Sequence, residues 1–432
     1  MDSLAQDLLR YLAGPDPATG GSNELFARLA SEKPVIRIGA TWIISRYDLV
    51  AALASHPRCV LELPGEWQNV AGVSAEAAAI ARRLLPVQPP AEHRRLRRLV
   101  SAQFSSRSAA EMGGQIRDIV DGLFTGPLQH GHCELVADIA VPLPVFTNAA
   151  LLGIPAHDWK QVLGWGTALN GLINQDTIRR YTALRQAGAA PSGTAPPEPR
   201  ASQDVVTSAS AVTRYVEDLI SRRQEKPGPD LVSRLAAQAE TGDGVLTHDE
   251  LTTLVLLLFM TGLDTVGSTL VNVVMALLRH ADAWQRVVAD PSLAGRAYTE
   301  AARLYPALPM MSRSAAADIE LSGLTIPAGA TIMLVYGAAN LDPAAFPDPL
   351  RFDMDRDGAR PMTFGHGPHY CLGAALALMQ GEAVLRKLAE SSPGFTLLGE
   401  PGPRRPEFAF HSVSTLPLRL GAHQREPAGQ PA

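Results

Sequence analysis

The sequence near the C-terminus reads Phe364-Gly365-His366-Gly367-Pro368-His369-Tyr370-Cys371-Leu372-Gly373-Ala374. Two glycines and a proline within four positions predict a tight turn, and the run from Leu372 to Leu378 has strong helix propensity. Cys371 therefore lies where a turn meets a helix N-terminus. Free N–H groups and the positive end of the helix dipole stabilise a thiolate there, and a thiolate binds metals or attacks electrophiles. We interpret Cys371 as a metal ligand or a nucleophile.

The composition favours a globular protein that acts on a small molecule. The chain has 432 residues, of which 46% are hydrophobic and 19% are charged, and its formal net charge is −5. This length allows two or three domains, although the composition shows no boundary between them. A weakly acidic chain is not typical of proteins that bind nucleic acids or anionic membranes.

The cysteines and the N-terminus indicate the compartment. Cys59, Cys133 and Cys371 are isolated and odd in number, which fits neither a disulfide framework nor a zinc site. The N-terminus lacks the pattern of a signal peptide, and the most apolar run, Leu254 to Met260, is much shorter than a membrane span. We expect a soluble cytoplasmic protein.

A basic helix is predicted directly after the prolines at 86–90. His93 and Arg97 are four residues apart and share one face, while Arg94 and Arg98 share the next face. One interpretation is a cationic surface in solvent. The other is that one face binds a buried anion and the other meets an acidic partner.

A long buried helix is predicted in the proline-free region 230–290. Thr247 and Glu250 have the spacing of a capping box, and a helix from there to about His280 would be roughly 50 Å long. The turns at 254–260 are apolar on all sides, which is typical of a helix in a protein core.

Polar residues interrupt this helix at Thr261-Gly262-Leu263-Asp264-Thr265, where a glycine, a carboxylate and hydroxyls are each unfavourable. One interpretation is a kink, with the threonines bonded to the preceding turn and Asp264 paired with a distant arginine. The alternative is that a polar group meets these residues.

Taken together, these features resemble the cytochrome P450 family of haem-thiolate monooxygenases in its soluble bacterial form. The cysteine stretch matches the family pattern F-x-x-G-x-H/R-x-C-x-G from Phe364 to Gly373. The other family motifs precede it in the expected order: His93 and Arg97 (H-x-x-x-R), Asp264 and Thr265 (an acid-alcohol pair), Glu300 and Arg303 (E-x-x-R), and then Arg313. The resemblance covers nearly the whole chain.

The resemblance implies a mainly α fold with small β-sheets, in which a triangular prism of helices surrounds a buried haem beneath a long distal helix. Residues 1–432 would form one domain and act as a monomer. The cofactor would be haem b, iron protoporphyrin IX, with Cys371 as the thiolate ligand of the iron. Phe364 would pack on the proximal face beside Gly365. The side chains that would neutralise the propionates are His93, Arg97, Arg313 and His369.

The implied reaction is hydroxylation or epoxidation of a medium or large apolar metabolite in secondary metabolism. Asp264 and Thr265 would relay protons during dioxygen activation. Glu300 and Arg303 would form a structural ion pair with the segment around 345–360. Oxidative coupling, desaturation or peroxide-driven oxidation remains an alternative, and a haem sensor without turnover is a more distant one.

The chain has no dinucleotide or flavin fingerprint, so electrons would come from a separate ferredoxin or flavodoxin and its NAD(P)H-dependent reductase. Arg94, Arg95 and Arg98 would form the docking surface. No nucleic-acid or membrane partner is expected. The Pro/Ala/Gly-rich stretch 187–203 is predicted to be a flexible lid loop, and residues 424–432 a disordered tail. Thr261 replaces the usual alanine or glycine, and its hydroxyl would reach the oxygen site or bond the helix backbone.

Overall fold

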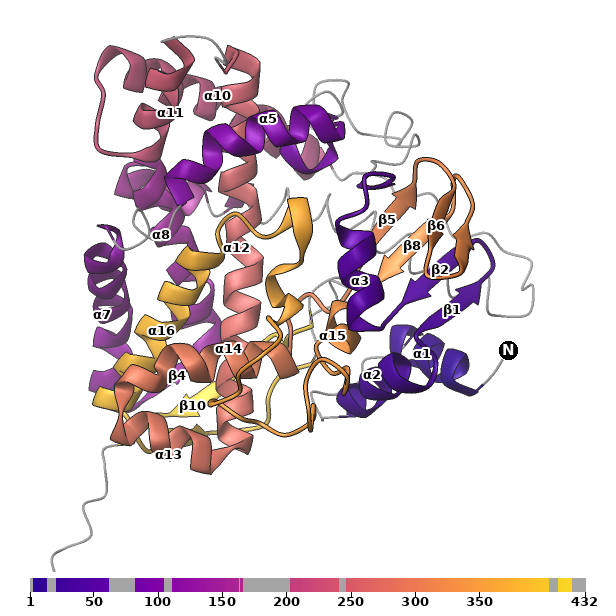
Figure 1. The fold of residues 1–432 in the computed structure, drawn as a ribbon. Helices are drawn as coiled ribbons and strands as arrows, with labels where there is room; N and C mark the ends of the chain where they lie inside the picture. Colours follow the sequence, from indigo (N-terminus) through magenta and orange to yellow (C-terminus); the bar gives the residue numbers. More distant parts are fainter. Residues whose placement is uncertain are drawn as a thin grey trace, which may run out of the picture.

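The computed structural model describes residues 3–13, 21–61, 82–104, 111–162, 164–165, 203–240, 246–403 and 411–421. Helices make up most of this part of the chain (Figure 1). Their bounds are α1 Ser3–Ala13, α2 Gly21–Glu32, α3 Tyr47–Ala54, α5 Pro90–Ser101, α7 Gly113–His130, α8 Pro142–Leu152, α10 Gln203–Glu225, α11 Leu231–Glu240, α12 His248–Arg279, α13 Ala281–Ala289, α14 Ala294–Leu304, α15 Tyr336–Ala339 and α16 Ala374–Ser391.

The strands form three small sheets. Their bounds are β1 Val35–Ile38, β2 Thr41–Ile44, β3 Cys59–Val60, β4 His132–Glu134, β5 Met311–Ala315, β6 Ile319–Leu321, β7 Leu324–Ile326, β8 Thr331–Leu334, β9 Thr396–Leu397 and β10 Pro417–Arg419. The largest sheet has the order β1-β2-β8-β5-β3, in which only β2 and β8 run parallel. The sheet therefore joins the N-terminal hairpin to segments almost 300 residues later. The predicted class, mainly α with small β-sheets, is confirmed.

Helix α12 runs through the middle of the molecule, with α8, α14 and α16 packed against it (Figure 1). It begins with the predicted capping box: the Thr247 hydroxyl accepts from the Glu250 N–H at 3.2 Å, and the Glu250 carboxylate accepts from the Thr247 N–H at 2.7 Å. Of the helices in the described ranges, α12 alone is long and apolar enough to cross a membrane. However, 76% of its most apolar window is buried inside the protein, so other helices cover its apolar surface.

The ion pair of Glu300 and Arg303 fixes α14 to the segment before the cysteine turn. The Arg303 side chain is fully buried and donates to the Glu300 carboxylate at 2.7 and 2.8 Å. Arg303 also donates to the carbonyls of Asn340 and Pro349, both at 2.8 Å. The predicted structural role of this pair is confirmed.

Three predicted segments lie outside the described residues. These are most of the loop between residues 61 and 90, the predicted lid at 187–203 apart from its last residue, and the predicted tail at 424–432.

Candidate functional site

The turn that carries Cys371 is built from two short 3₁₀ segments, Met362–Phe364 and Gly367–His369, followed by α16. The Phe364 carbonyl accepts from the Cys371 N–H at 2.8 Å, which closes the turn. Gly365 and Gly367 have φ of +74° and +69°, a region that side chains disfavour. A Cβ on Gly367 would also lie 2.6 Å from the Ser55 hydroxyl, so the turn rests directly on the end of α3.

The environment of Cys371 differs from that of the other two cysteines. Cys59 and Cys133 are buried, whereas Cys371 keeps an exposed surface. Protein nevertheless surrounds the Cys371 thiol closely enough for desolvation to raise its pKa. A hydrogen bond from the Gly373 backbone and the positive charge of Arg97 act in the opposite direction, because both stabilise the thiolate. Cys371 is thus the cysteine of the three with both an open side and groups that stabilise its anion.

Basic side chains from three elements converge beside the turn. His93 of α5 lies against His369 of the turn, with ring centroids 4.3 Å apart. Arg97 of α5 donates to the Tyr370 carbonyl. Arg313 of β5 is 3% exposed, and its Nε has no hydrogen-bond partner in the described structure.

These basic groups also interact electrostatically. Burial, together with the charges of Arg313, His93 and Arg97, lowers the pKa of His369 to about 3. Burial, Arg97 and Arg94 lower the pKa of His93. Among the described residues, none of the ion pairs brings a carboxylate to this cluster. The orphaned buried Nε of Arg313 and the guanidinium groups of Arg97 and Arg313, which meet no carboxylate of a described residue, fit an anionic group such as the two carboxylates of a haem.

The polar segment of α12 is continuous helix. The Thr261 hydroxyl donates to the Leu257 carbonyl at 2.9 Å, and the Thr265 hydroxyl donates to the Thr261 carbonyl at 3.2 Å. The interpretation that the threonines bond to the preceding turn is therefore confirmed, and Thr261 bonds the helix backbone. Helix α12 is continuous from His248 to Arg279, so the polar residues at 261–265 do not break it. Because Thr265 uses its proton inside the helix, its oxygen can still accept a hydrogen bond.

Glycines on both sides of Thr265 allow other helices to approach α12 closely. A Cβ on Gly262 would lie 2.3 Å from the Asn148 amide nitrogen of α8, which has no hydrogen-bond partner in the described structure. A Cβ on Gly267 would lie 2.5 Å from the Ala140 carbonyl oxygen of the π-helical turn Val136–Ala140. The sequence marks Gly262 as unusual, but nothing in it indicates Asn148 as its neighbour.

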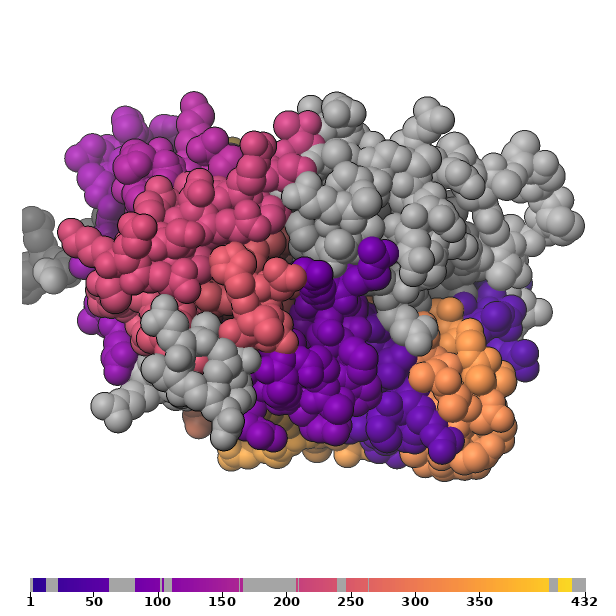
Figure 2. All heavy atoms as spheres, turned by 90° about the horizontal axis from the view of Figure 1, so that it is seen from above, coloured from indigo at the N-terminus to yellow at the C-terminus, as the bar shows by residue number. Residues whose placement is uncertain are grey.

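The outer face of α5 is less open than the sequence predicted. Arg94 and Arg98 are exposed, and Figure 2 shows α5 on the surface between the α10–α11 region and the orange part of the sheet. Arg95 instead pairs with Glu92 and with Glu250 at the start of α12. Two carboxylates already neutralise Arg95, whose side chain is half-buried, so Arg94 and Arg98 are the exposed arginines of the predicted docking surface.

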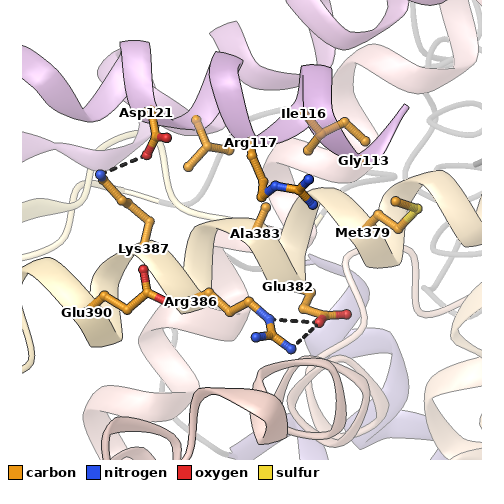
Figure 3. A pocket seen from close by; sticks show the side chains of 11 residues that line it. Gly113, Ile116, Arg117, Asp121, Met379, Glu382, Ala383, Arg386, Lys387 and Glu390 are labelled. Atoms are coloured by element: carbon orange, nitrogen blue, oxygen red, sulfur yellow. Dashed lines mark hydrogen bonds and ion pairs between the residues drawn. The ribbon is translucent and has the colours of Figure 1, made fainter. Parts of the chain in front are cut away.

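A cavity of about 400 Å³ lies between α7 and α16 (Figure 3). Ile116, Val120, Met379 and Ala383 form its apolar part. A Lys387–Asp121 ion pair of 2.7 Å joins the two helices beside it. Its lining includes none of the predicted site residues, so this cavity is separate from the site around Cys371.

Comparison with known proteins agrees with this geometry. A family model described as Cytochrome P450 matches residues 293–390. Cytochrome P450 monooxygenase PikC from Streptomyces venezuelae is 30% identical over 430 residues, which cover 97% of this chain and 93% of that protein. The 20-oxo-5-O-mycaminosyltylactone 23-monooxygenase from Streptomyces fradiae is 32% identical over 377 residues, covering 86% and 82%. The crystal structure of CalO2 matches with a TM-score of 0.80 and 26% identity, covering 97% of this chain and 98% of that one.

Proposed function

The chain belongs to the cytochrome P450 family of monooxygenases, and on that premise we propose that it hydroxylates or epoxidises a medium or large apolar metabolite of secondary metabolism. It would do so in the cytoplasm with haem b as cofactor. Electrons would come from a separate ferredoxin or flavodoxin and its NAD(P)H-dependent reductase. When bound, the thiolate-ligated haem supplies the activation of dioxygen.

The observation that carries the proposal is a cysteine with an exposed side, whose sulfur meets the Gly373 backbone and the Arg97 charge, beside two guanidinium groups, of Arg97 and Arg313, that no carboxylate among the described residues neutralises. Cys371 would ligate the iron as its thiolate, and the Gly373 hydrogen bond and the Arg97 charge would offset part of the desolvation that raises the pKa of this thiol. His93, His369, Arg97 and the orphaned Nε of Arg313 would bind the propionates. Phe364 and Gly365 would shape the turn against the proximal face of the macrocycle.

Asp264 and Thr265 would deliver protons on the distal side. The Thr265 hydroxyl donates to the Thr261 carbonyl, so its oxygen is available to orient a water molecule in the site. Asp264 is half-buried on the same helix, next to Thr265. We propose that Asp264 collects the proton and Thr265 positions its transfer.

The substrate class is supported by the relatives and by the apolar segments around the site. The relative from Streptomyces fradiae is named as a monooxygenase of 20-oxo-5-O-mycaminosyltylactone. Leu257 on α12 and Met310 before β5 are buried apolar side chains on segments that we assign to the distal pocket. Methionine adapts its shape to irregular ligands, which suits a large apolar substrate.

The electron donor would dock on the exposed part of α5. Arg94 and Arg98 would attract an acidic ferredoxin or flavodoxin. Replacing both by glutamine should slow electron transfer most at low ionic strength, while Arg95→Gln should instead weaken the contact with Glu250. Stopped-flow reduction at two salt concentrations distinguishes these effects. Equal reduction rates in all variants would exclude this docking surface.

The central experiment tests the ligand assignment. Reduced protein under carbon monoxide should show the Soret band of a thiolate-ligated haem, and Cys371→Ala should abolish it. Cys59→Ala is the matched control, because Cys59 is buried and burial raises its pKa to about 11. Persistence of the band in Cys371→Ala would refute the assignment.

A second experiment tests the proton route and separates dioxygen chemistry from peroxide-driven oxidation. Thr265→Ala should release more hydrogen peroxide per reduced nicotinamide consumed, at the expense of product, whereas Thr265→Ser should retain most of the coupling. A wild-type protein that forms product only with added peroxide would favour the peroxide-driven alternative. Spectral titration against terpenoid, polyketide and aromatic compounds would then narrow the substrate class.

A further inference from the structure

Asn148 of α8 lies against Gly262, the glycine in the polar segment of α12. Its side chain is 7% exposed. A Cβ on Gly262 would lie 2.3 Å from the Asn148 Nδ2 and 3.1 Å from both its Cγ and its Oδ1. The amide group therefore packs directly on the backbone of α12, at a position where only glycine leaves room.

The amide nitrogen of Asn148 is a hydrogen-bond donor without an acceptor. Its Nδ2 is buried and has no hydrogen-bond partner in the described structure. A leucine would occupy this helical position with the same number of side-chain heavy atoms and no polar group. Because a buried donor without an acceptor destabilises a fold, such a group indicates a bound water molecule or ligand.

A complementary acceptor lies beside this donor on α12. The Thr265 hydroxyl donates its proton to the Thr261 carbonyl at 3.2 Å, so its oxygen keeps two lone pairs that accept hydrogen bonds. Gly262 and Thr265 are three residues apart, which makes them neighbours on the surface of the helix. The unused donor of Asn148 and the unused acceptor of Thr265 therefore lie at neighbouring positions on one side of α12.

A water molecule satisfies both groups. Asn148 and Thr265 form no direct hydrogen bond among those that the described structure shows. One water accepts from an N–H and donates to a hydroxyl oxygen at the same time. The other close approach to this part of α12, that of Gly267 to the Ala140 carbonyl, presents an acceptor and supplies no donor.

We infer that Asn148 is a positioning residue whose amide holds a buried water molecule against the Thr265 hydroxyl. The water accepts from the Asn148 Nδ2 and donates to the Thr265 oxygen, which fixes that hydroxyl in its bond to the Thr261 carbonyl. Asn148 itself does not touch the reacting atoms. The consequence for catalysis rests on the proposed function, in which Thr265 positions a proton transfer, whereas the water site does not depend on that function.

Three variants separate the donor from the volume that it occupies. Asn148→Leu removes the amide, while Asn148→Ser keeps a hydroxyl donor and leaves space for water. Thr147→Val is the matched control, because Thr147 is the preceding residue of α8, is 0% exposed and has a hydroxyl without a hydrogen-bond partner in the described structure. Its atoms are not among those nearest to Gly262. If Asn148→Leu fails to fold, Asn148→Ala removes the donor without adding volume, and coupling then decides.

The first measurement is a crystal structure of the substrate-free holoprotein in which ordered water is visible. A water should lie within about 3.2 Å of both the Asn148 Nδ2 and the Thr265 Oγ1, in the wild type and in Thr147→Val. It should be absent from Asn148→Leu. A wild-type structure without water between these two atoms, or a variant Asn148→Leu that keeps it, would overturn the inference.

The second measurement is coupling with a surrogate ferredoxin and reductase. Asn148→Leu should retain the thiolate-type carbon monoxide band and raise peroxide release per reduced nicotinamide about two- to fivefold, as expected for the loss of one hydrogen bond. Asn148→Ser and Thr147→Val should stay close to the wild type.

The outcomes distinguish this inference from the proposed function. If the wild-type protein lacks the carbon monoxide band, the proposed function fails, while the crystal structure still decides the water site. If the band is present but Asn148→Leu couples as well as the wild type, the positioning role is refuted. Uncoupling of Thr147→Val or Asn148→Ser to the same extent as Asn148→Leu would also refute it, because the effect would then not depend on the donor.

Discussion

Replacing Glu300 by glutamine would leave the guanidinium of Arg303 buried without its counter-charge. Arg303 is fully buried, and the carboxylate of Glu300 is 5% exposed. Besides Arg303, this carboxylate accepts from the Asp353 N–H at 3.0 Å and from Arg356 at 3.3 Å. The amide of glutamine keeps the volume but presents an NH₂ group to these donors, so at least one of the hydrogen bonds is lost.

The magnitude follows from the burial of the pair. Removing one partner of a buried ion pair costs about 3–5 kcal/mol of the free energy of unfolding, because the other charge stays desolvated. Unfolding a chain of 432 residues has an entropy of about 0.9 kcal/mol/K, taking about 2.1 cal/mol/K per residue. The melting midpoint of Glu300→Gln should therefore fall by about 3–6 °C.

Thermal melting followed by far-UV circular dichroism measures this change, at the same scan rate for all variants. Asp355→Asn is the matched control, because Asp355 pairs with Arg286 at 2.8 Å and Arg296 at 3.2 Å but is 53% exposed. An exposed pair contributes at most about 1 kcal/mol, so the control should shift the midpoint by about 1 °C or less. A Glu300→Gln midpoint within 1 °C of the wild-type value would refute the reasoning from burial.

Three further outcomes are expected. Gly367→Ala should lower the melting midpoint and the haem content of the purified protein, because Gly367 has φ of +69° and the new Cβ would meet the Ser55 side chain. A normal haem content would contradict this prediction. Gly381→Ala should lower the urea midpoint of unfolding more than Gly367→Ala does, since its Cβ would lie 2.0 Å from the rigid Tyr298 ring. An unchanged urea midpoint would contradict this packing of Tyr298 on Gly381. Burial lowers the pKa of His411 to about 3, whereas an unfolded histidine has a pKa near 6.5. Below pH 6.5 the unfolded state therefore binds more protons than the folded state, and the free energy of unfolding falls as the pH drops toward 3. His411→Gln should reduce the difference between the urea midpoints at pH 7 and pH 5.

The sequence predicts the elements of the fold well because most of its evidence is local. The capping box at Thr247 and Glu250, the proline-free apolar run and the glycine-rich turn each act within a few residues, and the structure contains all three. The class of the fold was predicted from the family resemblance that these motifs carry. The five-stranded order could not be predicted, because it depends on pairing segments far apart in the chain.

The site was predicted in part. The resemblance to the P450 family implies that His93, Arg97, Arg313 and His369 form one group, and the structure brings these side chains together. The pairing of Arg95 with Glu250 could not be predicted, because nothing local to either helix indicates that their ends meet. The packing of the Tyr298 ring on Gly381 could not be predicted for the same reason, because the two residues are distant in sequence.

The large sheet has a consequence for the synthesis of the chain. Strand β3 ends at Val60, and its partner β5 begins at Met311, so 250 residues separate them. At translation rates of about 5–20 residues per second, the N-terminal strands wait roughly 12–50 s before that partner leaves the ribosome. During this interval the apolar side chains of residues 35–60 have no sheet to cover them. These strands therefore stay without their partners until β8 is complete, and with Cys371 as the proposed ligand, haem would be incorporated only after that residue has emerged.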